Sequence, residues 1–143
     1  MPTVQRSIDV AVAPSVAYEQ WAQFESFPLF ATSIKSVTRL DNTHLRWVAG
    51  IGSATARWDA EITEQLPGRL ISWRSTSGAT NRGVVRFSSL GENRTRVELT
   101  VDYEVRGGWA KAGAALGMDD RLAETLLKGF KRFVESRDAP GNR

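Results

Sequence analysis

The sequence contains no cysteine, which excludes disulfide bonds, thiol nucleophiles and zinc–thiolate sites. It contains one histidine, His44, beside a predicted turn, and a single imidazole without cysteine argues against a transition-metal site. There is no Ser/His/Asp set and no phosphate-binding loop, and Gly50-Ile51-Gly52 lacks the third glycine and the following helix of a dinucleotide fingerprint. We therefore expect no metal and no cofactor.

Long hydrophobic runs are also missing. No apolar stretch approaches the ~20 residues that a membrane-spanning helix needs. The start, MPTVQRSIDV, alternates like a strand and lacks the basic and then apolar order of a signal peptide, so we expect a cytoplasmic protein. The net charge is only +3, with 19 basic residues spread among 16 acidic ones. A nucleic-acid surface requires a basic cluster or stripe, so we expect no nucleic-acid partner.

Alternation of apolar and polar residues is the main positive signal. In residues 94–106, RTRVELTVDYEVR, every second side chain from Val97 to Val105 is apolar or tyrosine, and those between are mostly charged. A period of two predicts a strand of an antiparallel sheet that is covered on one side. The same pattern, bounded by turn residues, predicts six further strands at residues 5–13, 33–40, 45–50, 54–65, 70–77 and 83–90.

Helical spacing is confined to two regions. Residues 16–24 predict a short amphipathic helix with Ser15 as its N-cap, and Pro28 predicts a break followed by a second short turn. Asp119-Asp120 predicts the cap of a long final helix, and residues 109–117 predict a short helix or a mobile loop. The apolar stripe of the final helix consists of Leu122, Leu126, Leu127, Phe130, Phe133 and Val134.

The chain length predicts one domain over residues 1–138, with a disordered tail at 139–143.

Turn lengths predict how the hairpins are paired. In each predicted register apolar residues face apolar ones, and a slip of one residue would destroy that agreement. Opposite charges fall on the other face, where they serve register and solubility. The predicted pairs are Trp47 with Ala56, Leu45 with Trp58, Ile62 with Trp73, Ala60 with Ser75, Phe87 with Val97 and Val85 with Leu99 inside, and Arg86 with Glu98 and Glu61 with Arg74 outside.

The predicted inner face mixes very large and very small side chains. Each aromatic residue taken alone is most simply part of a packed core. A concave sheet that carries both kinds under one helix leaves unfilled volume, and ligand pockets are typically such apolar clefts. The aromatic residues are Trp47, Trp58, Trp73, Phe87 and Tyr103, and the small ones are Ala49, Ala54, Ala56, Ala60, Ser75 and Ser77.

The layout resembles the START-like superfamily of polyketide cyclase/dehydrase and lipid-transport proteins (SRPBCC), most closely its small bacterial members. The resemblance covers residues 4–137 and rests on AVAPSVAYEQWAQFESFPLF (11–30), WDAEITEQLPGRLISWRS (58–75), N-x-G-V-V-x-F (81–87) and RTRVELTVDYE (94–104). It implies an α+β helix-grip fold: a seven-stranded antiparallel curved sheet around a long C-terminal helix, with two short helices after the first strand.

The same resemblance implies a cavity between sheet and final helix that binds a hydrophobic small molecule such as a lipid, a quinone or a polyketide. Residues 107–118 would form a lid, since paired glycines give backbone freedom. By position, the ligand-binding residues would be Trp47, Trp58, Trp73, Ser75, Phe87, Tyr103, Leu122, Leu126 and Phe130, with Phe27 and Phe30 near the mouth.

Three functions stay open from the sequence. The first is a non-catalytic binder of a hydrophobic molecule. The second is a polyketide cyclase or aromatase, with Tyr103 as a weak candidate for general acid and Arg82 at the rim. The third is an interaction module whose Phe27–Phe30 segment or residues 107–117 contact a protein or, transiently, a membrane. The oligomeric state is not predicted.

Overall fold

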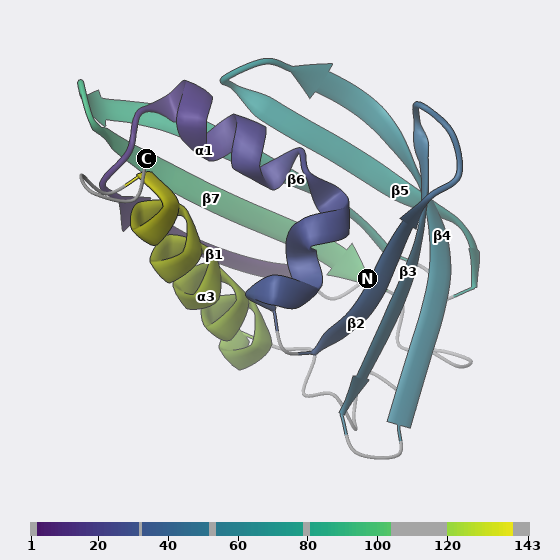
Figure 1. The fold of residues 1–143 in the computed structure, drawn as a ribbon. Helices are drawn as coiled ribbons and strands as arrows, with labels where there is room; N and C mark the ends of the chain where they lie inside the picture. The colour runs from purple at the N-terminus through teal and green to yellow at the C-terminus, as the bar shows by residue number, and fades with distance from the viewer. Residues whose placement is uncertain (1–2, 32, 52–53, 79–80, 104–119, 139–143) are drawn as a thin grey trace.

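The computed structural model describes residues 3–31, 33–51, 54–78, 81–103 and 120–138. Their strands form one antiparallel sheet in the order β1-β7-β6-β5-β4-β3-β2, so β1 lies beside the last strand (Figure 1). This confirms the predicted α+β helix-grip fold. The elements are β1 (Thr3–Val10), α1 (Pro14–Trp21), the 3-10 helix η1 (Phe24–Leu29), β2 (Ile34–Arg39), β3 (His44–Ile51), β4 (Ala54–Leu66), β5 (Leu70–Gly78), β6 (Asn81–Gly91), β7 (Arg94–Tyr103) and α3 (Asp120–Asp138).

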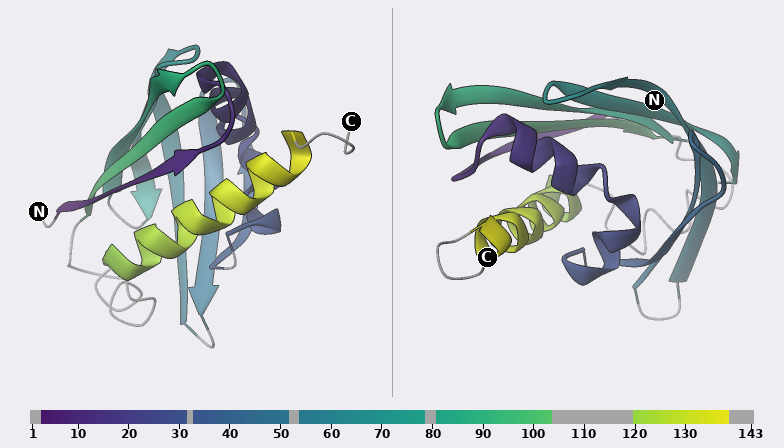
Figure 2. Two further views of the ribbon diagram at one scale, coloured as in Figure 1. Left: turned by 90° about the vertical axis from the view of Figure 1, so that its left-hand side faces the viewer. Right: turned by 45° about the horizontal axis from the view of Figure 1, so that its top comes forward.

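The sheet is curled, and the helices lie on its concave side. Register shifts interrupt the pairing of β4 with β5 at Asp59/Ala60 and at Ile62/Glu64. Such irregularities bend a strand and increase its local twist. The part of the sheet that contains β2, β3 and β4 turns toward the helices, and α3 crosses the concave face diagonally (Figure 2).

Most predicted strand pairs are confirmed. Phe87 lies opposite Val97, Val85 opposite Leu99 and Arg86 opposite Glu98. The pairs between β4 and β5, Ala60 with Ser75, Ile62 with Trp73 and Glu61 with Arg74, are also as predicted.

The register of β3 with β4 was predicted wrongly. Trp47 lies opposite Trp58 instead of Ala56, and Leu45 lies opposite Ala60 instead of Trp58. β3 continues into the predicted turn as far as Ile51, which pairs with Ala54. Because the total shift is two residues, each side chain stays on its predicted face.

The helices after β1 differ from the prediction in their ends. Ala13, in an extended conformation, occupies the N-cap position of α1 in place of Ser15, and Pro14 starts the helix. Proline suits the first turn of a helix, where its missing N–H has no partner to lose. The chain leaves α1 after Trp21, and Pro28 lies inside η1.

Hydrogen bonds connect α3 to the end of β1 and to the residue that follows it. Lys131 Nζ donates to the carbonyl oxygen of Asp9 (2.9 Å) and to Glu135 Oε2 (2.6 Å), and the Ala11 amide donates to the same Glu135 oxygen (2.8 Å). Burial opposes ionisation of Glu135, but these hydrogen bonds together hold its pKa below the usual value. The apolar face of the helix is buried through Ala123, Leu127, Phe130 and Val134.

A glycine lets α3 approach the segment after η1. A Cβ atom on Gly129 would overlap the carbonyl oxygen of Phe30. Alanine normally favours a helix over glycine by about 1 kcal/mol. At this position we expect Gly129→Ala to destabilise the protein instead, by ~1–3 kcal/mol, because the backbone of Phe30 must move. Urea unfolding measures the change; a stabilised variant would show that the close approach is absent.

Ion pairs cover the convex face of the sheet. Arg46 pairs with Asp59 at 2.8 Å and Arg74 with Glu61 at 3.0 Å. At the other edge, Arg96 binds Asp9 at 2.9 Å. The hydrogen bond from the arginine lowers the pKa of Asp59, and likewise that of Asp9. Since these pairs are on the surface, we assign them to solubility and register.

Asp41 gives a measurable dependence of stability on pH. Its carboxylate accepts hydrogen bonds from the Thr43 and His44 amides and from His44 Nδ1, which lower its pKa to about 2. A carboxyl whose pKa is lower in the folded state stabilises the fold above its unfolded pKa, and this stabilisation is lost as the pH falls through the folded pKa.

Asp41→Asn keeps the acceptor oxygen and removes the charge. We expect the variant to be less stable than the wild type at pH 7 and to lose less stability between about pH 4 and pH 2. Urea midpoints measured across this range test the expectation. Parallel curves for the two proteins would contradict it.

None of the helices in the described ranges combines the length and apolar character required to cross a membrane.

Candidate ligand-binding cavity

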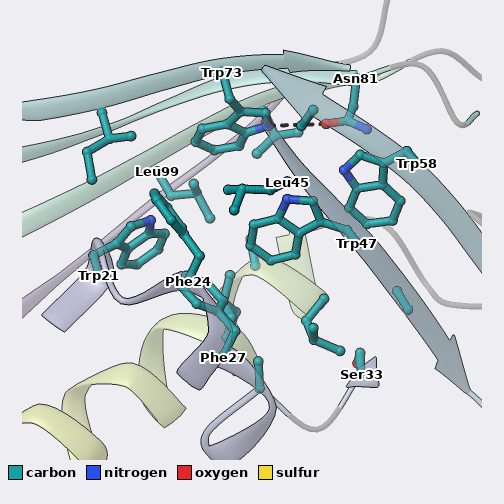
Figure 3. Close-up of a pocket in the computed structure, with 18 of the residues that line it drawn as sticks. Trp21, Phe24, Phe27, Ser33, Leu45, Trp47, Trp58, Trp73, Asn81 and Leu99 are labelled. Atoms are coloured by element: carbon teal, nitrogen blue, oxygen red, sulfur yellow. Dashed lines mark hydrogen bonds between the residues drawn. The ribbon is translucent and has the colours of Figure 1, made fainter. Parts of the chain in front are cut away.

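A cavity of about 140 Å³ lies between the concave face of the sheet and the helices (Figure 3). This is roughly ten times the ~10–15 Å³ that one water molecule needs by the same measure of space. Most of the described residues that line it are apolar. The exceptions are Ser33, Asn81 and Thr125.

Three indoles from consecutive strands form much of the wall on the sheet side. They belong to Trp47 on β3, Trp58 on β4 and Trp73 on β5. Trp47 and Trp58 lie directly opposite one another in the register, and their ring planes are parallel within 3° with centroids 6.1 Å apart. Small Ala49 and Ala60 line the same wall and leave the space in front of them open.

The facing wall comes from α1, η1 and α3. Phe27 meets Trp47 nearly at right angles, with centroids 5.2 Å apart, and Phe24 meets it at 69° and 6.3 Å. Trp21 is edge-on to Phe27 at 5.2 Å. Edge-to-face packing is a favoured arrangement of aromatic rings. These contacts fix the wall opposite the sheet, and Leu126 extends it from α3.

The polar side chains of β5 and β6 meet at one end of the cavity. Trp73 Nε1 donates a hydrogen bond to Asn81 Oδ1 at 3.2 Å (Figure 3). The backbone N–H of Asn81 donates to Ser75 Oγ at 3.0 Å. Asn81 is only 5% exposed although it lines the cavity, and a buried amide needs such partners.

The predicted ligand-binding residues fall into four groups in the structure. Phe27, Trp47, Trp58, Trp73 and Leu126 line the cavity. That they contact a ligand stays a prediction.

Other predicted residues face inward but lie behind the cavity wall. Phe87 is covered by Tyr18 and Trp21, with centroids at 5.8 and 6.3 Å, and Phe130 lies 5.0 Å from Trp21. Phe30 packs on Phe130 at 5.6 Å. These residues belong to the packed core and are not part of the lining.

Ser75 also departs from the prediction, because its hydroxyl oxygen supports the backbone of Asn81 and does not line the cavity. The side chains of Tyr103 and Leu122 lie outside the description, as do residues 104–119 with the predicted lid and the predicted helix or loop at 109–117. The predicted tail, 139–143, lies outside it too. The backbone of Tyr103 pairs with Asn81.

Two further sequence predictions are corrected. Arg82 pairs with Asp102 on the convex face at 3.1 Å and does not reach the cavity. The Phe27–Phe30 segment was predicted as a possible contact surface for a protein or a membrane. Phe27 and Phe30 are buried, at 2% and 9% exposed, so this segment presents only Leu29 strongly to solvent.

The sequence interpretation missed Trp21, Phe24, Leu45 and Asn81 as lining residues. Trp21 and Phe24 are apolar residues of the predicted helix at 16–24, but the pattern gives no sign that they face a cavity. Asn81 lies between the predicted strands at 70–77 and 83–90 and so reads as part of a turn. Its signal was the alternation of Asn81 with Gly83 and Val85, which continues the inner face of β6 two residues toward its start.

Comparison with known proteins places the chain in one family. The family model for polyketide cyclase/dehydrase and lipid transport matches residues 10–131. A 17.2 kDa protein from the melC2–rnhH intergenic region of Streptomyces lincolnensis is 36% identical over 138 residues, which are 96% of this chain and 92% of that protein.

The fold is shared with solved structures of other proteins. The Zhui aromatase/cyclase of a Streptomyces species is 18% identical with a TM-score of 0.82 over 99% of both chains. A START superfamily protein of Mycobacterium smegmatis is 20% identical with a TM-score of 0.76, over 94% of this chain and 97% of that one. At these identities the likeness concerns the fold alone.

Proposed function

Because the chain belongs to the polyketide cyclase/dehydrase and lipid transport family, we propose that it binds a hydrophobic small molecule in the cavity between the sheet and α3. The observation that carries the proposal is the cavity itself, with an aromatic and aliphatic lining on both sides. Concave, mostly apolar spaces with a few polar groups are the usual form of small-molecule sites.

Burial of apolar ligand surface supplies free energy for binding. Each Å² of this surface that leaves water contributes about 25 cal/mol. Association costs at least ~4 kcal/mol in lost translational and rotational freedom. The Trp47 and Phe27 rings are already fixed by their mutual contact, so little further ordering is required of them.

Binding is favoured over turnover by the chemistry of the described lining. Its polar groups are the hydroxyls of Ser33 and Thr125, the amide of Asn81 and the indole N–H groups. Hydroxyl, amide and indole groups do not ionise near neutral pH, whereas a cyclase requires positioned acid and base groups. If the protein is nevertheless a polyketide cyclase, Tyr103→Phe should abolish product formation; unchanged product would remove that role from Tyr103.

Lipid, quinone and polyketide are the ligand classes that we propose for the site. A cytoplasmic location and a transient membrane contact stay predictions from the sequence.

Native mass spectrometry of the purified protein tests the proposal. We expect a second species heavier than the chain by the mass of a small molecule, which organic extraction removes. If no ligand copurifies and the extracted protein binds no hydrophobic probe, the proposal fails.

A further inference from the structure

The indole of Trp73 lies against the backbone of the neighbouring strand. Trp73 on β5 pairs with Gly83 on β6. A Cβ atom on Gly83 would lie 2.5 Å from Cζ2 and 2.7 Å from Cη2 of the Trp73 ring, closer than any side chain permits. The six-membered ring of Trp73 therefore occupies the space that a side chain at position 83 would fill. Only glycine leaves this space free.

The N–H group of the same indole is bound by Asn81. Trp73 Nε1 donates to Asn81 Oδ1 at 3.2 Å, and Asn81 lies two residues before Gly83 on the same face of β6. The Asn81 backbone is in turn bonded to Ser75 Oγ. The ring thus has a support beneath it and a hydrogen bond at its edge, and it reaches from β5 across to β6 (Figure 3).

Three indole rings line the sheet side of the cavity. Trp47 and Trp58 are parallel within 3°, and Trp73 lines the same cavity. Flat aromatic faces bind the faces and edges of other rings favourably. A flexible chain gains less from such walls and loses more conformational freedom when it is bound.

We propose that Gly83 and Asn81 are positioning residues that hold the Trp73 indole flat along the sheet, and that the resulting wall makes the cavity select rigid, flat fused-ring molecules over flexible acyl chains. This inference rests on the proposed binding function and specifies its ligand class.

A matched pair of probes measures the selectivity. 1-Hydroxypyrene and 1-hexadecanol have the same number of carbon atoms and one hydroxyl group each, but the first is flat and rigid and the second is flexible. Binding of 1-hydroxypyrene is measured by the quenching of tryptophan fluorescence. Binding of 1-hexadecanol is measured by its ability to displace bound 1-hydroxypyrene. Each affinity is expressed relative to the probe's partition between water and octanol. We expect the wild type to prefer 1-hydroxypyrene by about tenfold or more on this scale.

Variants test the positioning roles. Asn81→Leu removes the acceptor for Trp73 Nε1, and we expect it to lower the preference to about twofold or less. Arg82→Leu is the matched control, because Arg82 is the next residue on β6 and points to the convex face, where it pairs with Asp102. We expect this control to keep the wild-type preference.

A double-mutant cycle shows whether Asn81 acts through Trp73. Trp73→Phe keeps a ring but has no N–H group for Asn81. In the Trp73→Phe background, Asn81→Leu should therefore cause no further change in the preference. A purely structural role of Asn81 would produce the same change in both backgrounds.

Gly83→Ala should reduce the preference as Asn81→Leu does, because the added methyl group displaces the ring. Its Cβ would also lie 2.8 Å from the Thr100 carbonyl oxygen, so circular dichroism must show that the variant folds. If it does not fold, the Asn81 variants decide the question.

The outcomes are distinct. Equal relative affinity of the wild type for the two probes would overturn the selectivity and leave the proposed binding function standing. An unchanged preference in Asn81→Leu would overturn its positioning role. Absence of binding of either probe to the folded wild type would overturn both the inference and the proposed function.

Discussion

Ala49→Phe is expected to weaken binding of 1-hydroxypyrene by about a hundredfold, which corresponds to ~2.7 kcal/mol. Ala49 lines the cavity from β3 and is 4% exposed, and a phenyl ring at this position extends into the space that the ligand requires. Because that space is open, the ring has room that a packed core would not offer. We therefore expect a small effect on stability, within the ~1–3 kcal/mol that overpacking typically costs.

Val48→Phe is the matched control for this variant. Val48 is adjacent on β3, so its side chain points to the opposite face of the sheet. We expect Val48→Phe to bind the probe with wild-type affinity. Isothermal titration of the three proteins gives the affinities, and thermal unfolding shows that each is folded. If Ala49→Phe binds as tightly as the wild type, the ligand is not in this cavity.

The second large effect concerns stability. Phe130 is fully buried on α3, where its ring packs against Trp21 at 5.0 Å and Phe30 at 5.6 Å. Replacing it with alanine removes these contacts and leaves a void that the surrounding rings fill only partly. We expect Phe130→Ala to lower the free energy of unfolding by ~3–5 kcal/mol, a large part of the roughly 5–15 kcal/mol of a typical domain.

Phe133→Ala provides the comparison on the same helix. Phe133 is partly buried and packs on Phe30 with centroids 5.2 Å apart. Because less of the Phe133 surface leaves water on folding, we expect Phe133→Ala to lower the free energy of unfolding by roughly half as much as Phe130→Ala does. Urea unfolding curves of both variants measure the two losses. A loss below ~1 kcal/mol for Phe130→Ala would contradict the placement of α3 on the aromatic cluster.

The fold was predictable because its signals are local and repeated. Alternation assigned the inner and outer faces, and turn residues placed the pairs of β4 with β5 and of β6 with β7. The pairing of β3 with β4 was not predictable in detail, since β3 continues into residues that read as a turn. That shift of two residues places Trp47 opposite Trp58 and so creates the parallel indoles of the cavity wall.

The lining of the cavity was predictable only in part. A period of two shows that Phe87 faces inward, and a helical stripe shows the same for Phe130. Neither pattern shows whether an inward-facing side chain reaches the cavity or lies behind its wall. Trp21 from α1 packs over both residues and faces the cavity in their place. Asn81 escaped prediction because a polar residue beside a turn has the composition of a loop, while its role depends on the Trp73 ring reaching across from β5.

The account depends most directly on an open apolar space beneath the sheet. A crystal structure of the protein under xenon pressure tests this, because xenon enters apolar cavities and leaves packed interiors empty. We predict xenon between Leu45, Trp47 and Leu99, which line the space from β3 and β7. An interior filled by the protein's own side chains, with no xenon bound among these three residues, would contradict the account.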